Sequence, residues 1–176
     1  MLTRKINAGV SLITTFLLLD HAIFHAVWML SRGSIAKNGS FMSWILMVFM
    51  VIHAYISIEL GISAHMGIEK RKCKSYPRIN TSTIIQRASG ILLVVLTGLH
   101  IGGTTGYLQP PKIVHAILPP LFFAVALMHV AVSTSKALIT LGIGNAKVIK
   151  IVDIIVKILC CATLIADLIG FYLYLC

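Results

Sequence analysis

The sequence predicts an all-α integral membrane protein, a single bundle of five transmembrane helices that takes up residues 1–176. Two observations lead to this fold class. The 176 residues are 58% hydrophobic and only 11% charged, with a mean hydropathy of +0.95, whereas a soluble domain of this length needs far more polar surface. The apolar residues also gather in five stretches, each long enough to cross about 30 Å of hydrocarbon at about 1.5 Å per residue.

The first helix is expected over residues 7–30, after a short basic start that contains Arg4 and Lys5. No small-residue cleavage site followed by a soluble domain ends this stretch, so we expect a retained helix and not a signal peptide. The polar segment 31–34 separates it from the second helix, which is expected over residues 41–64.

Three further helices complete the expected bundle, over residues 83–104, 114–139 and 148–174. The segments before them are polar or rich in residues that interrupt helices, and span 70–80, 102–111 and 142–147. Pro119 and Pro120 fall early in the fourth helix, where we expect them to kink its first turns.

The basic residues of the loops predict the orientation. One side receives Arg4, Lys5, Lys70, Arg71, Lys72, Lys74, Arg78, Lys136, Lys147 and Lys150, and the other receives Arg32, Lys37 and Lys112. Basic loops face the cytoplasm, so we expect a multi-pass protein of a prokaryotic cytoplasmic membrane with its N-terminus inside and its C-terminus outside. The net charge of +10 is then explained by orientation and anionic lipid. No basic stripe is interleaved with aromatic residues, which excludes nucleic-acid binding.

The four cysteines carry no recognisable motif. Cys73, Cys160, Cys161 and Cys176 form neither a CxxC nor a CxxCH pattern. Nothing therefore indicates a redox dithiol, a zinc site or a covalently attached haem.

Histidines provide the functional signal. His21, His25, His53, His100 and His129 lie deep in the first four helices, whereas His65 and His115 lie at helix ends and are interpreted as interfacial. Ionisable groups are costly inside a bilayer and are functional candidates by default. Two imidazoles from different helices can hold a six-coordinate haem iron for electron transfer, and four such ligands make two sites in one bundle.

Depth along the helices suggests how the ligands pair. Counted from the cytoplasmic ends, His21 and His100 lie about 21 and 26 Å deep, and His53 and His129 about 18 and 15 Å deep. This pairs His21 with His100 nearer the outside and His53 with His129 nearer the cytoplasm. His25, one turn beyond His21, matches the depth of His100 at least as well, so spacing alone leaves both open.

Two other interpretations of the histidines remain at this point. They can hydrogen-bond across helices without any cofactor. They can also form an intramembrane proton pathway with the acidic residues Asp20, Glu59 and Asp167.

The third helix carries the most specific pattern, Ile85-Gln86-Arg87-Ala88-Ser89-Gly90 with His100 fourteen residues after the glutamine. It resembles the start of the third helix in the dihaem cytochrome b subunit of succinate:quinone oxidoreductases, the family of succinate dehydrogenases and quinol:fumarate reductases. Ile52-His53-Ala54-Tyr55 is similar to the family's second-helix motif, and Leu19-Asp20-His21 stands at the family's first-helix spacing, which favours His21 over His25.

The fourth helix is similar to the family pattern with one departure. His129 is followed by a small residue, Ser133, by the basic Lys136 and by the closing Gly142. The family usually has glycine where Ser133 stands, and a residue of this size should still let a haem ring approach.

The resemblance implies a membrane anchor and electron-transfer subunit. His21, His53, His100 and His129 would ligate two b haems, which carry electrons between an iron–sulfur subunit and quinone or menaquinone. That subunit and a flavoprotein would dock on the cytoplasmic face, near the basic loop 70–78, and the flavoprotein would interconvert succinate and fumarate. Haem propionates need cationic or hydroxyl partners, and four residues near the cytoplasmic ends of helices three and four can supply them: Gln86, Arg87, Ser89 and Lys136.

Two rival functions stay open on the sequence. The chain can be the dihaem cytochrome b subunit of another complex, of the hydrogenase or formate dehydrogenase type. It can also be a haem-free transporter or channel subunit, which would usually show broken helices or repeated halves.

Overall fold

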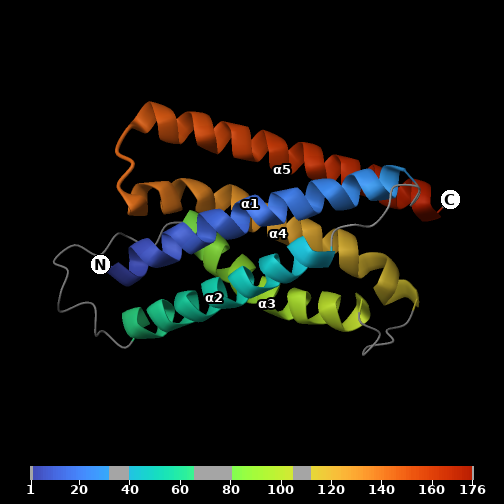
Figure 1. Cartoon of the computed structure of the whole chain (residues 1–176), viewed down its shortest axis with the longest axis horizontal. Coiled ribbons are helices and arrows are strands. Elements are labelled where there is room, and N and C mark those ends of the chain that lie inside the picture. The colour runs from blue at the N-terminus through green and yellow to red at the C-terminus, as the bar shows by residue number, and fades with distance from the viewer. Residues whose placement is uncertain (1, 32–39, 66–80, 105–111, 176) are drawn as a thin grey trace.

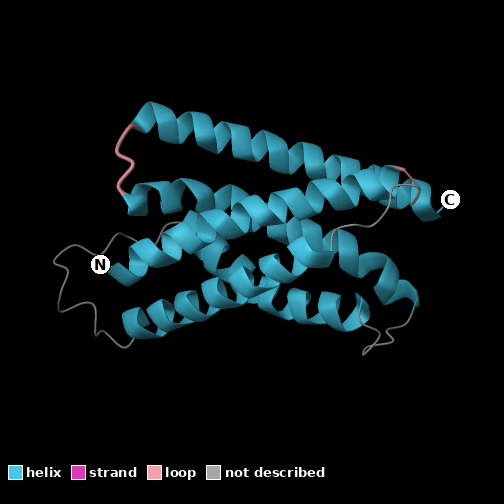
Figure 2. Cartoon of the chain, in the orientation of Figure 1, coloured by secondary structure: helices cyan, strands magenta, loops and turns pink. Residues whose placement is uncertain are grey.

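The computed structural model describes residues 2–31, 40–65, 81–104 and 112–175. These residues form five α-helices: α1 (Leu2–Leu30), α2 (Ser40–His65), α3 (Thr81–Thr104), α4 (Lys112–Leu141) and α5 (Ala146–Leu175) (Figures 1 and 2). The expected all-α fold and its five helices are confirmed. Most helices extend slightly beyond the expected bounds, and α1 gains most, because its first turn includes Arg4 and Lys5. The basic loop 70–78 lies outside the described residues.

Within the described residues, four helices, α1 to α4, are long and apolar enough to cross a membrane. Large apolar side chains lie exposed on all five helices, including Phe16, Phe41, Trp44, Ile91, Ile139, Ile158 and Tyr172. A soluble protein rarely exposes a contiguous apolar surface of this extent. The chain is therefore a multi-pass membrane protein.

The fifth helix differs from the other four in its charge. Lys147, Lys150, Asp153 and Lys157 fall within its first twelve residues. By length and apolar composition, the described spans are therefore α1 to α4, although α5 is as long as α4.

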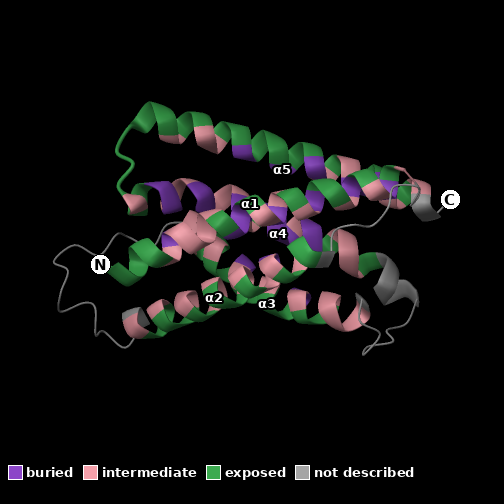
Figure 3. Cartoon of the chain, viewed as in Figure 1, coloured by how far each residue is buried: buried purple, intermediate pink, exposed green. Residues whose placement is uncertain are grey.

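The helices pack around α1 and α4. Helix α1 contacts α2, α4 and α5, and α4 contacts α3 and α5 as well (Figure 1). Among the described residues, α2 makes its extensive contacts with α1 alone and α3 with α4 alone. The buried residues accordingly follow α1, α4 and the facing side of α5 (Figure 3).

Two apolar clusters fill the interior. One joins α1, α2, α4 and α5, with Leu18, Leu46, Leu127 and Val156 among its members. The second joins α1, α3 and α4 through Ala22, Leu96, Phe122, Phe123 and Val125.

The turn between α4 and α5 is short because the sequence supplies both caps. Gly142 adopts a φ of 97°, which glycine reaches without steric cost. The amides of Gly142 and Ile143 donate to the carbonyls of Ile139 and Leu138, the pattern of a Schellman cap. The side chain of Asn145 then accepts from the amides of Lys147 and Val148 and caps α5.

Pro119 and Pro120 lie inside α4, which continues through them.

Helices α1 and α5 approach closely at Gly170. A Cβ atom built on this residue would lie 2.8 Å from Met29 Cβ and 3.2 Å from the backbone nitrogen of Leu30. Such distances are too short for a side chain, so glycine allows the two helices to meet at the backbone.

Gly170→Ala should therefore destabilise the protein, because the added methyl group forces α1 and α5 apart. A loss on the order of 1–3 kcal/mol is expected from overpacking of this kind. Thermal unfolding in detergent, followed by circular dichroism, measures it. Gly9→Ala is the matched control, since a Cβ at Gly9 meets nothing within 4 Å and alanine favours a helix by about 1 kcal/mol. Equal melting temperatures for the two variants would contradict the close contact.

Candidate functional site

The five deep histidines are all half-buried, and they lie on the first four helices as the sequence predicts. Helix α1 carries His21 and His25, and α2, α3 and α4 carry His53, His100 and His129. The side chains of His65 and His115 lie outside the described part of the chain.

His129 is held against α3 by two small residues. Its Nδ1 atom lies 2.9 Å from Ser89 Oγ, at hydrogen-bonding distance, and Ser89 is buried. A Cβ atom on the next residue, Gly90, would approach His129 Cε1 to 3.2 Å. The Ser89-Gly90 pair of the third-helix motif therefore forms the surface on which the imidazole lies.

The hydroxyl of Ser133 is occupied within its own helix. It donates to the carbonyl of His129 at 2.6 Å, one turn earlier on α4. The polar atom of Ser133 is thus satisfied locally, as is common for serine within helices.

The four residues expected to meet haem propionates lie on neighbouring turns of α3 and α4. Lys136 Nζ donates to Gln86 Oε1 at 2.9 Å and to Thr83 Oγ1 at 3.3 Å. Arg87 is exposed and lies close enough to Lys136 for electrostatic interaction. The hydroxyl of Ser89 lies beside His129 instead. Gln86, Arg87 and Lys136 therefore remain outside the buried core, and each has N–H groups that can donate hydrogen bonds.

His53 is held by the first helix. Its Nδ1–H donates to Asn7 Oδ1 at 3.0 Å, and the Asn7 amide in turn donates to Ser57 Oγ at 3.2 Å. His53 also lies within electrostatic range of His129, and the two imidazoles are held by different helices, α1 and α3.

The outer pair is held by different contacts. His21 Nδ1 lies 3.2 Å from Ser43 Oγ of α2. The His100 ring stacks on Phe122 of α4, with centroids 4.9 Å apart and an interplanar angle of 7°. One turn before His100, the buried hydroxyl of Thr97 has no hydrogen-bond partner within the described residues.

His25 turns toward a different helix from His21. Its Nδ1–H donates to Asp167 Oδ1 of α5 at 2.7 Å, and its ring stacks on Phe123 with centroids 4.9 Å apart. The Nδ1 atom of His25 is thus directed to a carboxylate of α5, and that of His21 to a hydroxyl of α2.

The sequence did not point to the residues that orient these imidazoles. Asn7 and Ser43 are single polar residues inside apolar stretches, which is too common a pattern to predict a contact, and Phe122 carries no polar signal. Nor did the sequence indicate that Asp167 meets His25, because this contact joins residues 142 positions apart.

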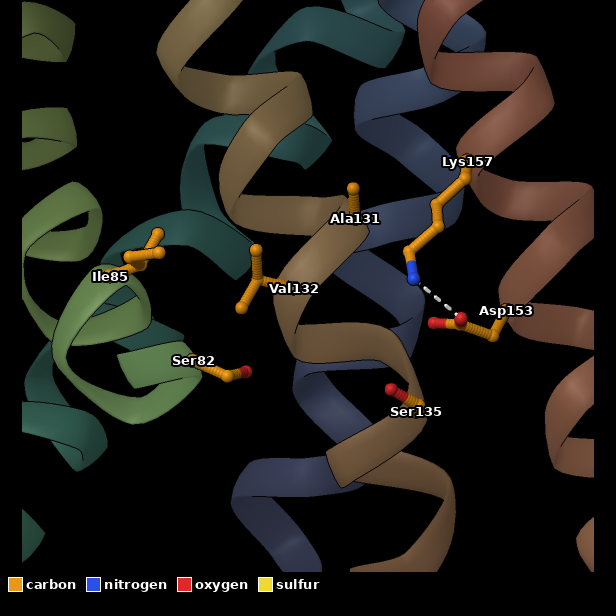
Figure 4. Close-up of a pocket in the computed structure, with 7 residues that line it drawn as sticks. All are labelled: Ser82, Ile85, Ala131, Val132, Ser135, Asp153 and Lys157. Carbon is orange, nitrogen blue, oxygen red and sulfur yellow. Dashed lines mark hydrogen bonds and ion pairs between the residues drawn. The ribbon is translucent and has the colours of Figure 1, made fainter. Parts of the chain in front are cut away.

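A separate cavity of about 280 Å³ lies between α3, α4 and α5 (Figure 4). Figure 4 shows its lining: Ser82, Ile85, Ala131, Val132, Ser135, Asp153 and Lys157. Lys157 and Asp153 form an ion pair of 2.6 Å along one side. None of the deep histidines lines this cavity.

The donor set suits a cofactor that brings most of its own ligands. Within the described residues, no three His, Cys, Asp or Glu side chains gather as a protein-only metal site requires. Haem iron needs only two axial ligands from the protein. Single imidazoles on separate helices, the small surface of Ser89 and Gly90 and the unpartnered Thr97 hydroxyl fit such a group.

Comparison of the chain with protein-family models, with curated proteins and with solved structures gives no match.

Proposed function

We propose that this protein is the membrane anchor and electron-transfer subunit of a succinate:quinone oxidoreductase, of the succinate dehydrogenase or fumarate reductase type. Two b haems, when bound, would supply one-electron redox chemistry between an iron–sulfur subunit and membrane quinone. His53 and His129 would hold the inner haem, and His21 and His100 would hold the outer one.

The observation that carries the proposal is the way the imidazoles are held. Three of the four proposed ligands have Nδ1 at hydrogen-bonding distance from a side chain of a neighbouring helix: His21, His53 and His129. A metal-bound histidine usually uses its second ring nitrogen in this way, which fixes the ring and leaves Nε2 for the metal. A histidine that only joins two helices needs one such contact too, but it does not need a glycine such as Gly90 beside its ring.

The remaining residues of the inner site have roles of charge and position. Lys136 and Arg87 are cations near the cytoplasmic ends of α3 and α4, where they would meet the propionates of the inner haem. Gln86 holds the Lys136 ammonium group at 2.9 Å. Ser89 acts on His129 instead of a propionate, because its hydroxyl already lies beside Nδ1.

The topology belongs to the same proposal. Helix α5 has 30 residues and packs along both α1 and α4, and it runs in the same direction as α1 (Figure 1). These contacts support a fifth crossing, with the N-terminus in the cytoplasm and the C-terminus outside. The iron–sulfur and flavoprotein subunits would then dock at the cytoplasmic end, where the basic loops gather.

The first test is the pigment of the purified protein. A reduced-minus-oxidised spectrum in detergent should show b-type bands, and a haem assay should give about two haems per chain. Succinate should reduce these haems when the partner subunits co-purify. A dihaem spectrum with no response to succinate would favour another complex, and a colourless, folded preparation would contradict the haem assignment.

Alanine variants of the ligands should separate the two haems. His53→Ala and His129→Ala should each remove the same low-spin signal, because a six-coordinate iron loses one axial ligand in either case. His21→Ala and His100→Ala should both remove the other signal. Electron paramagnetic resonance of the oxidised protein measures this, and loss of a single common signal in all four variants would contradict the pairing.

Asn7→Leu should raise the midpoint potential of the inner haem and leave the outer haem unchanged. The Asn7 oxygen accepts the His53 Nδ1–H, which makes the ligand more basic and stabilises the oxidised iron. A redox titration followed at the haem bands measures the shift. Ser57→Ala is the matched control, since Ser57 contacts Asn7 but no proposed ligand; an equal shift in both variants would contradict a direct effect through His53.

A further inference from the structure

The pair formed by His25 and Asp167 has no part in the electron route described above. Asp167 has a side chain only 4% exposed, and its contact with His25 is an ion pair when the imidazole is protonated. A carboxylate within an apolar bundle is costly and marks a functional site by default. In contrast, the ion pair of Asp153 and Lys157 on the same helix is open, with the lysine side chain 54% exposed.

The backbone is built to bring the two residues together. Gly170, one turn after Asp167, allows α5 to touch α1 at Met29 and Leu30, one turn after His25. A larger residue at Gly170 would move the carboxylate away from the imidazole. The ion pair therefore depends on the close backbone contact of these two helices at Gly170.

The chemistry of the pair is that of an oriented base. Because Asp167 Oδ1 accepts from Nδ1–H, the neutral imidazole keeps its lone pair on Nε2. A proton taken up there produces an imidazolium that the adjacent carboxylate stabilises. The His25 side chain is 24% exposed, so it can be reached from outside the bundle.

The pair lies beside the proposed outer haem. His25 stacks on Phe123 at 4.9 Å, Phe123 meets Phe122 at 5.6 Å, and Phe122 stacks on His100 at 4.9 Å, all between ring centroids. His25 is therefore connected to His100 through two aromatic rings and lies one turn from His21 along α1.

We propose that His25 and Asp167 form the proton-exchange site of the quinone reaction, with His25 as its catalytic base and Asp167 as a positioning residue. This inference rests on the proposed function. Oxidation of a quinol to a quinone releases two electrons and two protons. In each of two successive steps, a quinol O–H bond would break, its proton would join His25 Nε2, and one electron would leave to the outer haem that His21 and His100 would hold.

The proton then leaves toward the outer surface. From His25 to the end of α1 at Leu30 is about 7.5 Å along the helix, a short path to water. His25 Nε2 is thereby free for the second proton. In the reverse direction the same nitrogen gives protons to a quinone as it receives electrons.

The decisive variant is His25→Gln. The glutamine amide can still donate a hydrogen bond to Asp167, so the link between α1 and α5 is kept, but the amide cannot take up a proton. In the complex purified with its partners, reduction of the haems by a water-soluble naphthoquinol, followed by stopped flow, should slow by about 100-fold. The haem content and the dithionite-reduced spectrum should stay unchanged.

Further variants separate a proton role from a packing role. Asp167→Asn should also slow reduction by naphthoquinol, and Asp167→Glu should restore part of the rate, while Asp153→Asn on the same helix should match the wild type. The infrared difference spectrum between quinol-reduced and oxidised protein should show an imidazole protonation signal that His25→Gln removes. If Asp167→Asn fails to fold, His25→Gln still decides the matter.

The results that overturn the inference are distinct from those that overturn the proposed function. A wild-type rate in His25→Gln would show that His25 exchanges no proton with the quinol. Loss of a haem in His25→Gln would make His25 the axial ligand, with two haems in the wild type. A wild-type protein without haem would instead remove the proposed function itself, and this inference with it.

Discussion

The interior of this bundle is governed by the cost of a polar side chain without a partner in hydrocarbon. Among the deep histidines, His21, His25, His53 and His129 meet a hydroxyl, amide or carboxylate from another helix through Nδ1. Each such contact joins two helices that also pack against each other. These pairs are α1 with α2, α1 with α5 and α3 with α4, so the polar contacts and the helix packing support one another.

Much of the fold could be predicted from the sequence, because a bilayer imposes length and hydropathy on every crossing. All five helices appear near their expected bounds, and the turn at Gly142 and Asn145 contains the residues that its geometry demands. The arrangement of the helices could not be predicted. Apolar stretches of similar composition do not encode which neighbour each one meets, and a contact such as Gly170 with Met29 follows only from close packing of distant segments.

The candidate site was predictable in its chemistry and less so in its geometry. Imidazoles inside apolar stretches stand out in the sequence, and so does the motif around Gln86 and Ser89. Their partners did not stand out, since a single Asn7 or Ser43 within an apolar helix is too common to signal a contact. The different partners of His21 and His25 could not be predicted either, because they depend on α2 and α5 and not on spacing along α1.

The contact between α1 and α5 has a consequence for how the chain is made. Ribosomes release α1 before α5, so His25 stays without its carboxylate, and α1 without its broadest partner, until α5 has emerged. A chain interrupted before Asp167 would lack both Asp167 and Gly170. Quality-control proteases would then meet a membrane protein whose first helix still displays an unsatisfied imidazole, which the arrival of α5 conceals.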